Sequence, residues 1–117
     1  MIKLTLTEEQ AKIVSTACEF YCRIRIGQWN EILWYCLDLK RDDYCEARDA
    51  AEQYLLEARK FVYPELYGIG HSYGVGKFED ADIAFDVYQV LRHILGDSRT
   101  PWSMSPEELP KCEKVNE

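Results

Sequence analysis

Apolar and polar residues follow one another along this chain with two different periods. Residues 1–6 alternate, with Ile2, Leu4 and Leu6 apolar, which is typical of a short strand or an extended arm. From residue 8 onward the apolar positions recur at intervals of three and four, as they do on one face of a helix. This second period predicts four helices, over about residues 8–24, 29–39, 44–63 and 78–95.

Start and stop signals support these helices. Thr7 and Gln10 form a capping box for the first helix, and Gly27 interrupts the pattern after it. Pro64 ends the third helix, because a proline biases the preceding residue away from the helical region. Gly96 follows the fourth helix at the position where a glycine commonly terminates one.

The distribution of side chains around the helices predicts which faces are buried. The 29–39 segment is apolar nearly all round, so we expect it to lie in the core or in an oligomer interface. The 44–63 helix carries an apolar stripe opposite a charged face; the stripe comprises Tyr44, Ala47, Ala51, Tyr54, Leu55, Ala58, Phe61 and Val62. A polar line on the last helix is interpreted as a solvated face; it comprises Asp82, Asp86, Gln89 and His93. The alternative is that these side chains face the loop and form hydrogen bonds with its backbone, or line a pocket.

We therefore predict an all-α fold: a single small domain that forms a bundle of three to four helices, with a short N-terminal extended arm and a glycine-rich loop before the last helix. A chain of 117 residues is long enough for one modest core and too short for two. Residues 1–96 form the helical domain in this prediction. Residues 97–117 contain three prolines and no periodicity, so we expect an extended polar C-terminal tail.

The net charge limits the binding partners that we expect for this protein, and the cysteines bear on its cellular compartment. A net charge of −7 argues against a broad electrostatic grip on nucleic acid, and it fits a basic partner or a small ligand in a local pocket. The sequence shows neither an apolar leader segment nor a run approaching the ~18 apolar residues of a membrane span, so we expect a cytoplasmic protein without membrane contact. The five cysteines then stay reduced, and without a Cys-x-x-Cys pair they are interpreted as small buried residues, with Cys112 exposed in the tail.

The segment 64–77, PELYGIGHSYGVGK, is a glycine-rich loop that leads directly into the last helix. Converging backbone N–H groups at such a junction can hold phosphate or carboxylate, and nearby side chains add donors and charge. The candidate ligand-binding residues here are Gly70, His71, Ser72, Tyr73, Gly74, Gly76 and Lys77. The loop matches neither the P-loop nor the G-x-G-x-x-G motif. The alternative is a tightly turning connector, since Glu79, Asp80 and Asp82 already occupy the positive end of the following helix.

A second candidate set consists of Arg23, Arg25 and Trp29. Arginine recognises phosphate or carboxylate in a planar, bidentate manner, and tryptophan offers a face on which a base can stack. Together with the glycine-rich loop, these side chains would form a pocket for a nucleotide-like molecule. The alternative is that they belong to an ordinary helix surface.

Two acidic pairs, Asp49-x-x-Glu52 and Glu79-x-x-Asp82, resemble the magnesium signature of the all-α NTP pyrophosphohydrolases, the MazG and dUTPase-like families. The resemblance implies that the four carboxylates hold Mg²⁺ against a triphosphate. The chain departs from the family pattern in having Asp49 where the first Glu belongs. We keep this enzyme as an alternative and expect a non-enzymatic protein without metal or cofactor.

The stretches TLTEEQAKIVSTACEFYCRIRIGQWNEI and GIGHSYGVGKFEDADIAFDVYQVLRHIL resemble small uncharacterised proteins encoded by phages and prophages of Gram-positive bacteria. This resemblance implies an anti-defence protein in the cytoplasm of a bacterial host, one that sequesters a small nucleotide-like immune signal. It also implies an alternative, an acidic inhibitor of the anti-CRISPR or DNA-mimic type that binds a defence protein directly. The apolar 29–39 segment leads us to expect a homo-oligomer.

Overall fold

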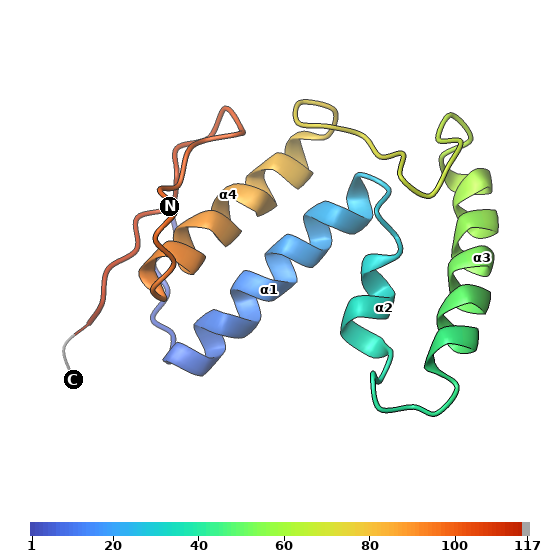
Figure 1. Cartoon of the computed structure of the whole chain (residues 1–117). Coiled ribbons are helices and arrows are strands. Elements are labelled where there is room, and N and C mark those ends of the chain that lie inside the picture. Colours follow the sequence, from blue (N-terminus) through green and yellow to red (C-terminus); the bar gives the residue numbers. More distant parts are fainter. Residues whose placement is uncertain (116–117) are drawn as a thin grey trace. The chain divides into compact units, whose positions relative to one another are not determined.

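The computed structural model describes residues 1–115, which contain four helices: α1 (Glu8–Arg25), α2 (Glu31–Cys36), α3 (Tyr44–Val62) and α4 (Glu79–Ile94) (Figure 1). No strand occurs among these residues, so the predicted all-α fold is confirmed, and the arm before α1 has no regular secondary structure. Contacts divide the chain into two compact units. Unit 1 combines Met1–Cys22 with the chain from Val75 onward, and unit 2 is Arg23–Gly74.

The ends of the helices follow the local signals in the sequence. The Gln10 N–H donates to Thr7 Oγ1 at 3.2 Å and the Thr7 N–H donates to Gln10 Oε1 at 3.0 Å, so the capping box is confirmed. After α1, Gly27 adopts a φ of 99° and the Gln28 N–H donates to the Arg23 carbonyl. Gly96 has a φ of 118° after α4. Both glycines therefore end their helices in the left-handed conformation that only glycine adopts without strain.

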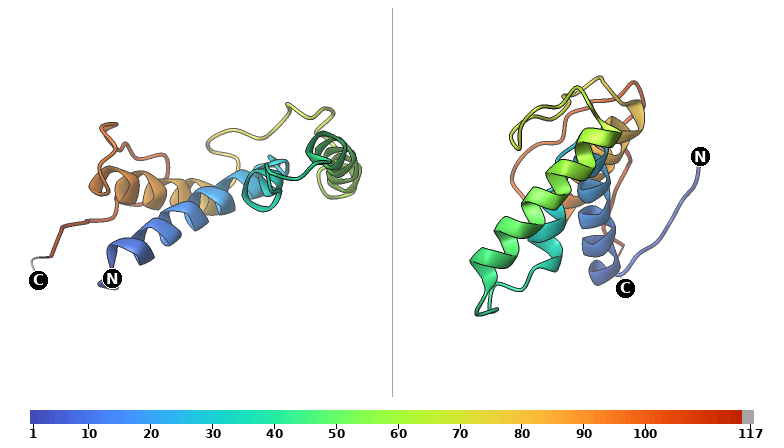
Figure 2. Two further views of the ribbon diagram at one scale, coloured as in Figure 1. Left: turned by 60° about the horizontal axis from the view of Figure 1, so that its bottom comes forward. Right: turned by 90° about the vertical axis from the view of Figure 1, so that its right-hand side faces the viewer.

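Unit 1 is built on the antiparallel pair α1 and α4, which lie side by side in both Figure 1 and Figure 2. The Tyr21 hydroxyl donates to Asp80 Oδ2 at 2.6 Å, and Ser15 Oγ lies 3.5 Å from the Tyr88 carbonyl oxygen. The first contact joins the end of α1 to the start of α4, and the second joins the middles of the two helices. The buried apolar side chains of this unit are Cys22, Ala81, Val90 and Leu91.

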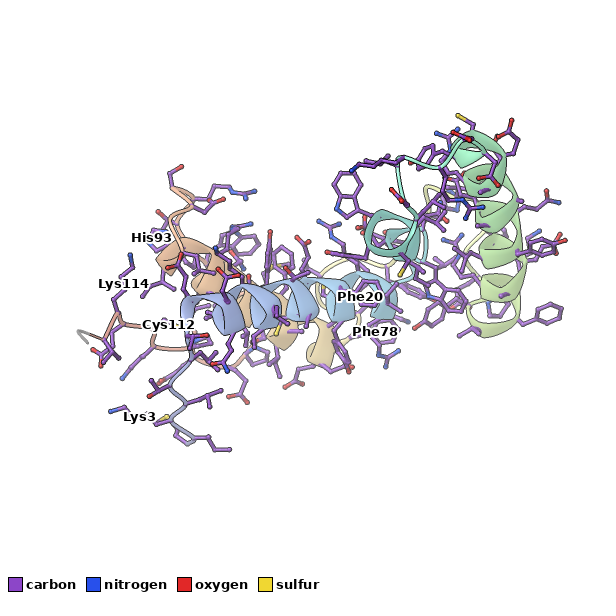
Figure 3. All side chains as sticks on the ribbon, turned by 90° about the horizontal axis from the view of Figure 1, so that it is seen from below. Lys3, Phe20, Phe78, His93, Cys112 and Lys114 are labelled. Carbon is purple, nitrogen blue, oxygen red and sulfur yellow. The ribbon has the colours of Figure 1, made fainter. Side chains whose placement is uncertain are left out.

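The polar line on α4 is a buried row, and the interpretation as a solvated face is wrong for three of its four members. Asp82, Asp86 and Gln89 are all buried, whereas His93 is exposed at the end of the helix (Figure 3). Each buried member forms hydrogen bonds with backbone groups outside the helix, beginning with the Gly76 N–H, which donates to Asp82 Oδ2 at 2.9 Å. Burial is tolerated because these polar side chains have partners.

The other two members of this row hold the C-terminal tail. Asp86 accepts hydrogen bonds from the Met104 N–H at 2.7 Å, from the Ser105 N–H at 3.2 Å and from the Ser105 hydroxyl at 2.6 Å. The Gln89 amide exchanges two hydrogen bonds with the backbone of Trp102. The tail therefore lacks regular secondary structure, as expected, but is fixed to α4 through its backbone.

The most apolar segment of the sequence, residues 29–39, is exposed or half-buried throughout. The helix α2 is shorter than the predicted 29–39 span, and none of its residues is buried. The side chain of Trp34 is 80% exposed and Leu39 after the helix is also exposed. The expectation that this segment lies in the core is wrong for these side chains, and its role in an oligomer interface stays a prediction.

The exposure of the cysteines differs from the expectation that they are small buried residues with Cys112 exposed. Cys22 is buried, but Cys36 and Cys45 are exposed. Cys112 on the tail is half-buried rather than exposed, and burial raises the pKa of its thiol (Figure 3). None of the helices in residues 1–115 combines the length and apolarity needed to cross a membrane.

Candidate ligand-binding cavity

Arg59 on α3 organises unit 2. The residue is buried, at 3% exposure, and its guanidinium donates to three backbone carbonyls. Nη1 lies 2.9 Å from the carbonyl oxygen of Gly27 and 2.9 Å from that of His71, and Nη2 donates to the carbonyl of Gly68. One side chain thereby ties α3 to the turn after α1 and to the glycine-rich loop. Hydrogen bonds from a charged donor are among the stronger ones in proteins.

The turn at Gly27 is packed against the segment that follows α3. A Cβ atom at Gly27 would lie 2.6 Å from Leu66 Cδ1. Leu66 is itself a buried apolar residue of unit 2. Only glycine satisfies both the left-handed φ and this close approach, so the path of the backbone from Gly27 into Gln28 depends on it.

A cavity of about 260 Å³ lies within unit 2, beside Arg59. Its lining comes from the turn before α2 and the start of that helix, from α3, and from the glycine-rich loop. The lining residues are Gln28, Trp29, Asn30, Glu31, Leu55, Leu56, Arg59, Ile69, Gly70 and Ser72. The cavity thus combines aliphatic and aromatic walls with amide, hydroxyl and charged groups, a composition typical of small-molecule sites.

The Trp29 indole is held in place by its neighbours. Its Nε1–H donates to the carbonyl of Ile24 at 3.1 Å, and its ring meets that of Tyr63 in an edge contact with centroids 6.2 Å apart. Tyr63 in turn contacts the Tyr73 ring at 5.3 Å. Three aromatic residues from the turn, the end of α3 and the loop therefore form one cluster, which fixes the aromatic wall of the cavity.

A polar chain leads from the end of α1 to the cavity. Arg23 Nη1 donates to Gln28 Oε1 at 2.7 Å, and Gln28 Nε2 lies 3.4 Å from Ser72 Oγ. The Tyr73 N–H donates to the Ile26 carbonyl at 2.8 Å, which places the loop backbone against the turn after α1. Because Arg23 donates to the side-chain oxygen of Gln28, the orientation of that amide is fixed and its N–H groups point toward the loop.

The positive charge of the Arg59 guanidinium is compensated by the dipoles of backbone carbonyls rather than by a carboxylate. Within residues 1–115 it forms no ion pair, and its Nε is buried without a hydrogen-bond partner. Among the described residues, the one acidic side chain that lines the cavity is Glu31 at the start of α2. The cavity wall therefore carries one positive and one negative group, and it favours no strongly charged ligand of either sign.

The structure brings part of the predicted site together. Trp29, Gly70 and Ser72 line the cavity, and Arg23 reaches it through Gln28. Of the remaining predicted residues, Arg25 donates to the Tyr63 hydroxyl, His71 contributes its carbonyl to Arg59, Tyr73 joins the aromatic cluster, and Gly74 ends unit 2. Gly76 and Lys77 belong to unit 1 and do not line the cavity; the Gly76 N–H is occupied by Asp82.

Sequence reasoning missed Arg59, the central residue of the site. The available signal was its spacing: Arg59 lies four residues after Leu55, on the same helical face. A charged residue on the same face as a core-type leucine suggests a buried cation with dedicated partners. The partners themselves, three carbonyls, have no sequence signature.

The described residues contain no group of three or more His, Cys, Asp and Glu side chains that could hold a metal ion. Of the four residues that resemble the pyrophosphohydrolase signature, Asp82 is buried and engaged with the backbone of Gly76. Comparison with known proteins gave no match to a protein-family model, to a curated protein or to a solved structure.

Proposed function

We propose that this chain is a non-enzymatic binding protein whose unit 2 cavity holds the base portion of a small nucleotide-like molecule. The observation that carries the proposal is that an aromatic residue, Trp29, lines one cavity together with Gln28, which has an amide side chain, and Ser72, which has a hydroxyl. Planar heterocycles are commonly bound by an aromatic face together with hydrogen bonds along their polar edge. Leu55, Leu56 and Ile69 supply the apolar part of the lining.

The dimensions and charge of the cavity define the class of ligand. Its volume of about 260 Å³ is just below the ~300–1,000 Å³ of drug-sized pockets, which suits a base or nucleoside better than a dinucleotide. No lysine of the described chain lines it, and Arg59 uses its Nη atoms on backbone carbonyls. Affinity should therefore depend on the identity of the base more than on the number of phosphates.

The wider part of the proposal is that binding sequesters an immune signal in a bacterial host. Its support is the resemblance to phage-encoded proteins, together with a cavity suited to holding a ligand. A sequestering protein releases its ligand chemically unchanged, whereas a pyrophosphohydrolase releases products. Recovery of the bound molecule therefore separates the two.

The test is a thermal-shift series of nucleobases, nucleosides and nucleotides, with and without Mg²⁺, followed by chromatography of the recovered ligand. A ligand that binds only the folded state raises Tm by mass action. We expect a rise that follows the base, that decreases in Ser72→Ala and Leu56→Trp, and that is unchanged in Ser98→Ala, an exposed serine of unit 1. Cleaved ligand would contradict a non-enzymatic role, and the absence of any shift across the series would overturn the proposal.

A further inference from the structure

The helix α3 has two distinct faces, and of the apolar stripe in the sequence only Leu55 lines the cavity. Leu55, Leu56 and Arg59 face the cavity of unit 2. In contrast, Tyr54 is 73% exposed and Phe61 is 90% exposed. The residues of their own unit therefore cover these two rings only to a minor extent. Large exposed aromatic side chains on one helix face commonly mark an interaction surface.

The stripe that carries these two rings has the spacing of a coiled coil. Ala47, Ala51, Tyr54, Ala58 and Phe61 follow one another at intervals of four, three, four and three residues. Ala51 and Ala58 then occupy a positions, and Tyr54 and Phe61 occupy d positions. We call these five residues the α3 seam. None of them is charged, so covering the seam buries no unpaired charge.

We propose that the α3 seam binds the α3 seam of a second copy of this chain, in an antiparallel two-helix coiled coil. A parallel pair would place like positions together, so that Phe61 meets Phe61 and Ala58 meets Ala58. Reversing one helix instead brings a positions opposite d positions. Ala51 then lies against Phe61 of the second copy and Ala58 against Tyr54, so that each layer combines one large and one small side chain, as close packing requires.

The exposed area of the seam suits a weak dimer. An aromatic side chain buries roughly 150–250 Å² when fully covered, and the rings of Tyr54 and Phe61 start from exposures of 73% and 90%. Their burial in both copies, with the alanines and the exposed Val62, approaches the ~1,000 Å² that a specific interface needs. An interface of this size is typical of a weak, transient dimer.

The edge of the seam predicts how salt affects the dimer. Glu57 is exposed beside the seam, and the antiparallel arrangement brings it close to Glu57 of the second copy. Each copy also carries a net charge of −7. Both effects are screened by salt, so the dimer should strengthen with ionic strength. Glu57→Gln should strengthen it a few-fold at low salt and reduce the salt dependence.

The experiment is sedimentation equilibrium of the full chain over a wide concentration range, without ligand. We expect a monomer–dimer equilibrium that Phe61→Glu weakens at least about tenfold, because aromatic side chains carry much of the energy of such interfaces. Lys60→Glu is the matched control: this exposed neighbour lies off the seam, and its replacement makes the chain more negative than Phe61→Glu does.

Two outcomes would overturn the proposal. One is a wild-type chain that stays monomeric at millimolar concentration; the other is a dimer that Phe61→Glu and Lys60→Glu affect equally. Tyr54→Ala, a milder change in the seam, should also weaken the dimer, and helical circular dichroism verifies that each variant is folded. The dimer is independent of the proposed ligand, since the seam and the cavity lie on different faces of α3.

Discussion

The guanidinium of Arg59 and the carbonyl oxygen of Gly27 lie 2.9 Å apart, although 32 residues separate them in the chain. The same side chain holds two carbonyls of the glycine-rich loop. The two segments that border the cavity together with α3 are therefore positioned by one residue. The geometry of the candidate site therefore depends on this buried cation as well as on the contacts of the loop with the turn.

Replacing Arg59 with methionine should destabilise unit 2 strongly. The change removes the charge-assisted hydrogen bonds to the buried carbonyl of Gly27 and the part-buried carbonyls of Gly68 and His71, at an expected cost of about 1.5–3 kcal/mol. Urea denaturation measures this cost. Lys60→Met, at the exposed neighbouring position, should cost less than about 0.5 kcal/mol. Equal effects of the two changes would contradict the organising role of Arg59.

Gly27→Ala should be more damaging than Gly96→Ala. Both glycines have positive φ, so both substitutions introduce backbone strain of about 1 kcal/mol. At Gly27 the new Cβ would also lie 2.6 Å from Leu66 Cδ1, whereas at Gly96 it would meet no atom of the described residues within 4 Å. The difference in Tm between the two variants measures this contact, and equal values would show that Leu66 yields without cost.

Asp86→Asn should release the tail from α4. The carboxylate accepts from the Met104 N–H, the Ser105 N–H and the Ser105 hydroxyl, and an amide offers only one acceptor atom. Amide hydrogen exchange should therefore accelerate at Met104 and Ser105 while the α4 amides remain protected. Asp49→Asn, an exposed carboxylate on α3, is the control and should leave the tail unchanged.

The pKa of Asp97 should rise in Arg99→Ala. In the wild type, the side-chain hydrogen bonds from Arg99, followed by its backbone N–H, hold the pKa of the Asp97 carboxyl well below its ordinary value. Because the folded-state pKa is lowered, any stabilisation from this carboxylate is present above the ordinary pKa of about 3.9 and is lost as the pH falls toward the folded-state value. Titration of Asp97 by NMR tests this, and an unchanged pKa in the variant would contradict it.

Local features of the fold could be predicted from the sequence, because they depend on residues a few positions apart. Thr7 and Gln10 start α1, and Gly96 ends α4, as their sequence positions indicate. The buried faces were harder to predict. Counting polar residues as exposed fails at Asp86 and Arg59, since each finds its partners on backbone that is distant along the chain.

Only some of the residues that line the cavity could be predicted from the sequence. Trp29 was a candidate because it follows two arginines, and Gly70 and Ser72 because they lie in the glycine-rich loop; all three line the cavity. Leu55 and Leu56 gave no signal beyond a helical face. Arg59 determines which face of α3 meets the loop. Its acceptors are backbone oxygens, which every residue has, so no pattern of side chains in the sequence predicts them.

Unit 1 is formed by two segments of the chain that unit 2 separates, and this has a consequence for the order of folding. Unit 2 is continuous from Arg23 to Gly74, so a growing polypeptide contains all of it before Val75 has been synthesised. The part of α1 that belongs to unit 1, residues 8–22, cannot meet α4 until later, because all of unit 2 separates the two in the chain. On the ribosome, α3 and the loop can therefore assemble around Arg59 first. Nascent chains that are released before α4 has been synthesised should contain a formed cavity and an N-terminal helix that lacks its partner α4.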